Sequence, residues 1–144
     1  MNIYLLIAAS LSAIAALLHL GCIYFGASWY RFFGAGEHMA LMAEQGSWQP
    51  TIITLVIFSV LSLWSAYAFS AAGLIIRLPF IRLALSLITL VYLVRGLAGF
   101  TLMSFTLKNN PMGRSPEFWL WSSVICLIVG IVHAIGLKKQ WATL

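Results

Sequence analysis

Long apolar runs separated by short polar segments make up almost the whole chain. Four of the runs cover residues 3–26, 52–76, 78–105 and 118–137, and each is long enough to cross a bilayer as a helix, which takes about 20 residues. Helices satisfy their own backbone hydrogen bonds in lipid, and the alternating pattern of a membrane strand does not occur in the sequence. The pattern predicts an all-α fold, a bundle of four transmembrane helices that forms a single membrane domain over residues 1–144.

One polar stretch interrupts this pattern between the first two spans. Residues 29–51, "WYRFFGAGEHMALMAEQGSWQPT", hold two of the three acidic residues and one of the three histidines. Between Gly36 and Gly46 the residues are good helix formers, and Glu37 and Glu44 fall on one helical face. We therefore expect a short helical outer loop, lying at the membrane interface or folding back among the spans.

The other two connectors predict ordinary turns. The segment "IIRLPF" predicts a tight basic hairpin with Pro79 as the first residue of the third helix, where a missing N–H costs nothing. The segment "KNNPMGRSPE" is rich in turn residues, and Ser115 or Pro116 is expected to start the last helix.

The composition indicates that the apolar helices belong to an integral membrane protein. Hydrophobic residues make up 62% of the chain and charged residues 8%, and the mean hydropathy is +1.01, values far outside the range of soluble domains. The net charge of +5 is small enough to reflect membrane anchoring, so nucleic-acid binding is not expected.

Lys and Arg near the span ends predict the orientation. The side that holds both termini carries one more basic residue than the other side. The sequence therefore predicts a multi-pass protein of a bacterial inner (plasma) membrane with both termini cytoplasmic. The basic residues are Arg77, Arg82, Lys138 and Lys139 on the terminal side, and Arg31, Lys108 and Arg114 on the other.

Polar side chains inside the spans are the first candidates for function, because burying them in lipid is costly. His19 and Arg95 both lie about 10 Å below the outer ends of their spans, and Glu37 and His38 leave the loop just above that level. We expect Glu37 to pair with Arg95, with Trp64, which is mid-span, lining a pocket beneath the loop. The same residues are compatible with a purely structural ion pair, a His19 bonded to a backbone carbonyl of a neighbouring helix, and a solvent-facing His38.

A metal site is an alternative use of the same cluster. His19 and Cys22 at i, i+3 share a helical face, and Glu37 with His38 would complete four ligands. A Ser-His-Asp triad is excluded because the chain has no Asp, and Cys22 and Cys126 form no C-x-x-C. The remaining histidine, His133, is deep in the last span and is expected to pack there or near the cytoplasmic interface. The sequence leaves both the cofactor and enzymatic activity undecided.

Two short motifs carry a family resemblance. The segments "RFFGAGE" at residues 31–37 and "YLVRGL" at residues 92–97, together with the small size and four spans, resemble the small four-helix bacterial inner-membrane proteins that include the DoxX-like families. This resemblance implies the same membrane architecture and transfers no catalytic residue.

Three functions remain open at this point. The first is binding of a lipid, quinone or similar amphiphile in an outer-leaflet pocket under residues 29–46. The second is a membrane enzyme or metal protein that uses His19, Glu37 and His38. The third is an accessory or oligomeric subunit of a larger complex. The corresponding partners are membrane lipids, a hydrophobic small molecule, or a second copy or partner membrane protein, and no nucleic acid.

Overall fold

The computed structural model describes the backbone of residues 1–109 and 115–144 and the side chains of residues 1–105 and 115–144. In this described part every regular element is a helix, and four helices are long and apolar enough to cross a membrane. The predicted all-α bundle with a helical loop after the first span is confirmed, and the chain is a multi-pass membrane protein. The helices are α1 (Ile3–Phe25), α2 (Ala27–Phe32), α3 (Glu37–Glu44), α4 (Gln49–Ala72), α5 (Ile81–Asn109) and α6 (Pro116–Gln140).

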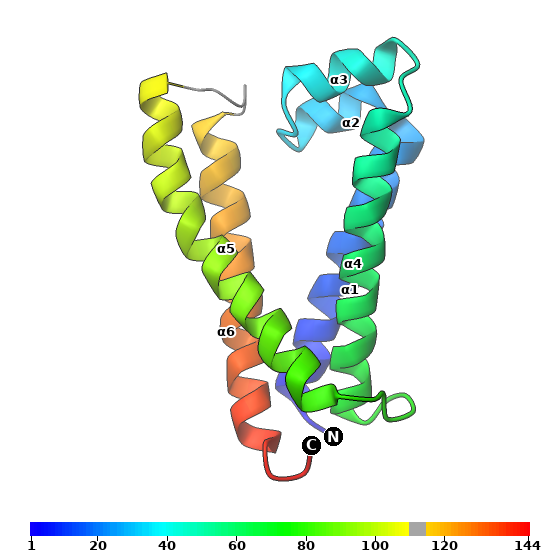
Figure 1. Cartoon of the computed structure of the whole chain (residues 1–144), viewed down its shortest axis with the longest axis vertical. Coiled ribbons are helices and arrows are strands. Elements are labelled where there is room, and N and C mark those ends of the chain that lie inside the picture. The colour runs from blue at the N-terminus through cyan, green and yellow to red at the C-terminus, as the bar shows by residue number, and fades with distance from the viewer. Residues whose placement is uncertain (110–114) are drawn as a thin grey trace.

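The four long helices form two antiparallel pairs, which we call arms (Figure 1). One arm consists of α1 and α4 and carries the short helices α2 and α3 at its tip, and the other consists of α5 and α6. Both chain termini lie at one end of the molecule, here called the terminal end, and the opposite end is called the α2–α3 end. The arms meet near the terminal end and diverge toward the α2–α3 end (Figure 1).

Small residues bring α5 and α6 together within their arm. A Cβ atom added at Gly96 would lie 2.6 Å from Leu127 Cγ, and one added at Gly130 would lie 2.9 Å from Leu93 Cδ2. Each glycine thus accepts a leucine from the facing helix, which is how membrane helices gain close packing without a hydrophobic driving force.

The long helices of the two arms contact each other through a second set of close approaches in the terminal half. Leu5 packs on Gly136, where an added Cβ would lie 2.7 Å from Leu5 Cγ, and Asn2 Nδ2 donates to the Gly136 carbonyl at 2.8 Å. Farther from the terminal end, Ser12 Oγ and Tyr92 Oη are hydrogen-bonded at 2.9 Å. We call this region the inter-arm core, and its fully buried members include Leu5, Ala9, Ser12, Ala68, Leu85 and His133.

The second span ends earlier than the apolar run predicts. Helix α4 stops at Ala72 and not at Ile76, because Gly73 takes a left-handed conformation with φ 83°. The Ser70 hydroxyl then fixes the chain beyond it, donating to the Ile76 carbonyl at 2.8 Å and accepting from the Leu78 amide at 2.9 Å. The two apolar residues Ile75 and Ile76 therefore belong to the connector.

The prediction that Pro79 starts the third helix is wrong. Helix α5 begins at Ile81, and Phe80 before it has a positive φ of 52°. At the other connector the prediction is confirmed, since Ser115 accepts a hydrogen bond from the Phe118 amide at 3.2 Å as the cap of α6. The turn-rich residues 110–114 lie outside the described residues.

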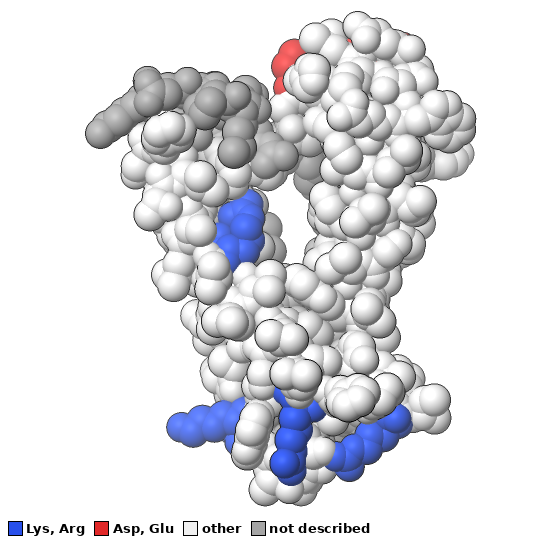
Figure 2. Space-filling view, viewed as in Figure 1, with Lys and Arg blue, Asp and Glu red and all other residues white. Residues whose placement is uncertain are grey.

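Basic side chains gather at the terminal end, and acidic ones are visible at the α2–α3 end (Figure 2). Two of the basic residues lie over aromatic rings, Arg82 at 5.7 Å from the ring centre of Trp141 and Lys139 at 4.3 Å from that of Tyr4. Such contacts suit a membrane interface, where cations and aromatic rings anchor the helix ends. The side chains of Lys108 and Arg114, counted for the other side, lie outside the described ones.

Candidate functional site

A space separates the two arms in the α2–α3 half of the molecule, and we call it the opening (Figure 2). Its floor is the inter-arm core, where Trp64 of α4 meets Tyr92 of α5 edge to face at 5.0 Å between ring centres. Its roof is the turn between α2 and α3, because a Cβ added at Gly34 would lie 3.0 Å from the Phe118 side chain. The opening is thus enclosed at both ends and bordered by helices at bilayer depth.

Arg95 belongs to the wall that α5 and α6 form. Its Nη2 donates to Ser122 Oγ at 3.0 Å, and its guanidinium lies 5.0 Å from the ring centre of Trp119. Because the neighbouring Gly96 faces Leu127, the side chain must run about five residues, or ~7 Å, toward the α2–α3 end to reach Ser122. The arginine therefore extends along the helix toward the membrane surface, as long cationic side chains do in bilayers.

One atom of this arginine and one atom of a neighbouring serine lack hydrogen bonds to described residues. Arg95 Nη1 and Ser123 Oγ are both buried and have no partner among the described residues. Both atoms lie against Gly99, where an added Cβ would overlap Ser123 Oγ and stand 2.8 Å from Arg95 Nη1. Because Gly99 has no side chain, it leaves room for these two polar atoms between α5 and α6. Both atoms have unused hydrogen-bonding capacity.

The predicted Glu37–Arg95 pair is wrong. Glu37 binds Arg31 instead, with Arg31 Nη2 to Glu37 Oε1 at 2.6 Å and Arg31 Nε to Glu37 Oε2 at 2.9 Å. Arg31 also binds Glu44 Oε1 through Nη1 at 2.6 Å. These hydrogen bonds from Arg31 hold the pKa of both carboxyl groups below the ordinary value. Among the described residues, these are the only two ion pairs, and both lie on the exposed surface.

His19 lies on the α1 face that is directed toward the other arm. Leu5 and Ser12 contact that arm, and His19 follows them at the same seven-residue interval, which keeps one helical face. Counting outward from the Leu5–Gly136 contact, His19 and Ser122 are equally far along their helices, at ~21 Å. His19 and the Arg95 guanidinium therefore share one height on opposite walls.

The hydrogen bond of His19 fixes its neutral tautomer. Nδ1 lies 2.7 Å from the Ala15 carbonyl, which can only accept, so Nδ1 carries the proton. In the neutral ring Nε2 is then an acceptor, and no described residue bonds to it. The expectation that His19 bonds a backbone carbonyl of a neighbouring helix is wrong, because the Ala15 carbonyl belongs to the same helix, α1.

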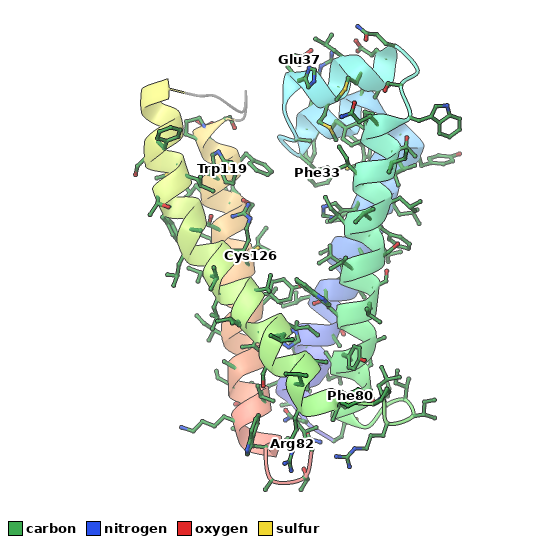
Figure 3. All side chains as sticks on the ribbon, in the orientation of Figure 1. Phe33, Glu37, Phe80, Arg82, Trp119 and Cys126 are labelled. Carbon is green, nitrogen blue, oxygen red and sulfur yellow. The ribbon has the colours of Figure 1, made fainter. Side chains whose placement is uncertain are left out.

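The other predicted site residues lie apart from this pair. Trp64 is in the floor, and Glu37 and His38 lie on the exposed surface of α3. Figure 3 shows Glu37 and Phe33 on the α1–α4 side of the opening, and Trp119 and Cys126 on the α5–α6 side. Within the described residues no three of His, Cys, Asp and Glu come close enough to hold a metal ion, so the set His19, Cys22, Glu37 and His38 is not assembled.

His133 is a packing histidine, as predicted, but it lies in the inter-arm core and not at an interface. It is fully buried, stacks on Tyr92 at 5.6 Å between ring centres, and neither ring nitrogen has a partner among the described residues. Sequence reasoning missed the two serines at residues 122 and 123. Their signal was a pair of hydroxyls one turn inside an otherwise apolar span.

Two shallow hollows also occur at the terminal end, one lined by residues 77–83 with Leu144 and one by residues 1–4 with Lys139, Gln140 and Thr143. Both are wide open to the surface at the ends of the spans. The opening is the better candidate because it lies between helices and has polar side chains on two facing walls.

No protein-family model, curated protein or solved structure matches this chain. The resemblance to the DoxX-like families therefore stays a prediction.

Proposed function

We propose that the protein binds an amphiphilic molecule of the membrane, a lipid, quinone or similar compound, in the opening between its arms. The observation that carries the proposal is the pair of polar side chains, Arg95 and His19, at one height on the two walls of a space at bilayer depth. An amphiphile matches both parts of this space. Its polar group meets the two side chains, and its apolar part fills the remainder.

The helices that border the opening are strongly apolar, which suits the apolar tail of such a molecule. In the α2–α3 half, α4 and α5 also expose aliphatic side chains, such as Ile52, Val56, Val94 and Leu97. The described helices border the opening as two arms and leave the space between the arms open to the membrane. A membrane molecule therefore reaches the opening by lateral diffusion within the leaflet. No passage from water is required.

We also place the protein in a bacterial inner membrane with both termini in the cytoplasm. Four basic residues at the terminal end support this orientation, since positive charge favours the cytoplasmic side. In this orientation the opening faces the outer leaflet.

The test blocks the opening with a large side chain and leaves the rest of α1 unchanged. The protein is extracted in native membrane patches, transferred to mild detergent, and weighed intact by native mass spectrometry. His19→Trp fills the opening and is expected to abolish co-purification of the bound molecule. Leu17→Trp is the matched control, because Leu17 is 62% exposed on another face of the same helix.

Two results would contradict the proposal. One is a wild-type protein that carries no small molecule under conditions in which other membrane proteins retain lipid. The other is a molecule retained equally by both tryptophan variants, because it would then be bound outside the opening.

A further inference from the structure

Among the described residues, Arg95 forms no ion pair. The sequence contains three acidic residues, and two of them, Glu37 and Glu44, are bound to Arg31. The third, Glu117, is exposed in the first turn of α6 and forms no ion pair with a described residue. Every acid that the sequence offers is therefore accounted for, and none neutralises the arginine in the span.

The immediate surroundings of Arg95 solvate the cation only in part. A guanidinium carries five N–H donors, and the described residues accept one hydrogen bond from it, at Ser122. Its Nη1 is buried without a partner, and the Trp119 ring adds a cation–π contact. Hydroxyl and ring contacts do not neutralise a charge, and a cation in a membrane without a counter-charge is costly.

We infer that the ligand of the opening is an anionic phospholipid whose phosphate supplies the missing charge to Arg95. The inference rests on the proposed function and narrows its ligand to one chemical class. Arg95 is only partly buried, which leaves part of its side chain accessible to a ligand, and guanidinium–phosphate pairs are among the strongest hydrogen-bonded contacts in proteins.

The depth of the guanidinium suits a lipid head group. Ser122 lies seven residues from the Ser115 cap of α6, or ~10 Å along the helix. Helix α6 has 25 residues and is therefore about 37 Å long, a few ångströms longer at each end than a hydrocarbon core of about 30 Å. The arginine is thus a short distance inside the core, where a head group drawn slightly inward meets it.

His19 on the facing wall extends the recognition. With its proton on Nδ1, its Nε2 accepts a hydrogen bond. A head group with hydroxyl groups next to the phosphate, such as phosphoglycerol, offers both the anion for Arg95 and a donor for His19.

The test compares two lipids with the same chains. Dioleoylphosphatidylglycerol and uncharged dioleoylglycerol are titrated separately into delipidated protein, and the bound fractions are measured by native mass spectrometry. We expect the wild type to bind the phospholipid at least about tenfold more tightly, the effect of one charge-assisted contact. Arg95→Met should abolish this preference.

The matched control is Arg82→Met. Arg82 is on the same helix and also lies over a tryptophan ring, but at the basic terminal end. The substitution removes the same charge and should leave the preference for phosphatidylglycerol within about twofold of wild type, since the charge at that end is exposed and screened.

The outcomes separate the inference from the proposed function. Equal affinity of the wild type for the two lipids overturns the inference and leaves amphiphile binding intact. The same holds if Arg95→Met and Arg82→Met lose the preference for phosphatidylglycerol to the same extent. If neither lipid binds to the wild type, the inference and the proposed function are both overturned. If Arg95→Met does not fold, thermal unfolding of the wild type decides, because phosphatidylglycerol must then raise the unfolding temperature more than dioleoylglycerol does.

Discussion

The terminal half and the α2–α3 half of the bundle consist of the same four long helices, yet these helices pack across the arms in the terminal half, whereas at the α2–α3 end the arms approach each other through the turn at Gly34, which lies against Phe118. In the terminal half, small residues such as Gly136 lie between the arms and let Leu5 approach the facing backbone. In the other half, the small residues Gly96 and Gly99 lie within one arm, between α5 and α6. The position of small residues therefore decides where membrane helices close on one another and where they leave space.

The two arginines at the α2–α3 side show the same contrast in electrostatics. Arg31 is at the surface and holds two carboxylates, whereas Arg95 is inside a span and holds none. An exposed ion pair contributes little to stability, so Glu37 and Glu44 stabilise the fold only slightly through Arg31. The cation that needs a counter-charge is the one that borders the opening.

The largest expected effect is on the packed half. Gly136→Val adds atoms where a Cβ alone would already lie 3.0 Å from the Leu5 backbone nitrogen, so the arms must separate. We expect a loss of about 2–3 kcal/mol in the free energy of unfolding, the usual cost of overpacking. The measurement is a denaturant titration in detergent.

Ile131→Phe adds three carbon atoms to α6, as Gly136→Val does, but Ile131 is 50% exposed, so stability should change by less than about 0.5 kcal/mol. Equal losses in the two variants would show that α6 tolerates no added volume anywhere, and the contrast between the halves would fail.

The next effect concerns the hydrogen bond that crosses between the arms. Tyr92→Phe removes the hydroxyl that is bonded to Ser12 at 2.9 Å and leaves a fully buried serine unpaired. We expect a loss of about 1 kcal/mol. Tyr92→Phe combined with Ser12→Ala should cost less than the two single changes added together, and strict additivity would show that the bond contributes nothing.

A smaller effect of opposite sign is expected at His133. Its ring is fully buried with both nitrogens unbonded to any described residue, so His133→Phe removes an unsatisfied polar group and keeps the stacking on Tyr92. Stability should be unchanged or higher by about 1 kcal/mol. A clear loss in thermal unfolding would mean that the imidazole has a partner in the membrane.

The smallest effect is at the surface, and it depends on pH. The pKa of Glu37 and that of Glu44 are lowered by Arg31, so their stabilisation of α3 is present above the unfolded value of about 4.3 and is lost as the pH falls through the lower folded values. Hydrogen exchange of α3, corrected for intrinsic rates, should accelerate below about pH 4 relative to pH 7. A variant with Glu37→Gln and Glu44→Gln should lack this additional acceleration, and an identical response in both proteins would show that Arg31 does not stabilise α3.

The spans were predictable from the sequence because their length and hydropathy are local properties. The end of α4 was not, since Ile75 and Ile76 continue the apolar run and only the left-handed Gly73 and the Ser70 hydrogen bonds turn the chain. Hydropathy predicts whether a residue lies in the membrane, but it does not predict the residue at which a helix ends.

The partner of Glu37 was mispredicted for a geometric reason. Depth counting placed Glu37 near Arg95, but the left-handed glycines Gly34 and Gly36 reverse the chain between α2 and α3. That reversal brings Glu37 back to Arg31, six residues earlier. The two glycines were visible in the sequence as a turn signal, and depth along a span carries no information about rotation around it.

The separation of the arms in the α2–α3 half is the central claim, and paired cysteines test it most directly. With Cys22 and Cys126 replaced by Ala, one protein carries His19→Cys and Ser122→Cys, which lie at one height on opposite walls of the opening. A second carries Leu5→Cys and Gly136→Cys, which belong to the same two helices where they touch. After oxidation in membranes, free thiols are counted by maleimide labelling of the denatured protein. We predict a disulfide in the second protein and two free thiols in the first, because bridged cysteines need Cα atoms within about 7 Å; a disulfide between positions 19 and 122 would show that the arms close and that no opening exists.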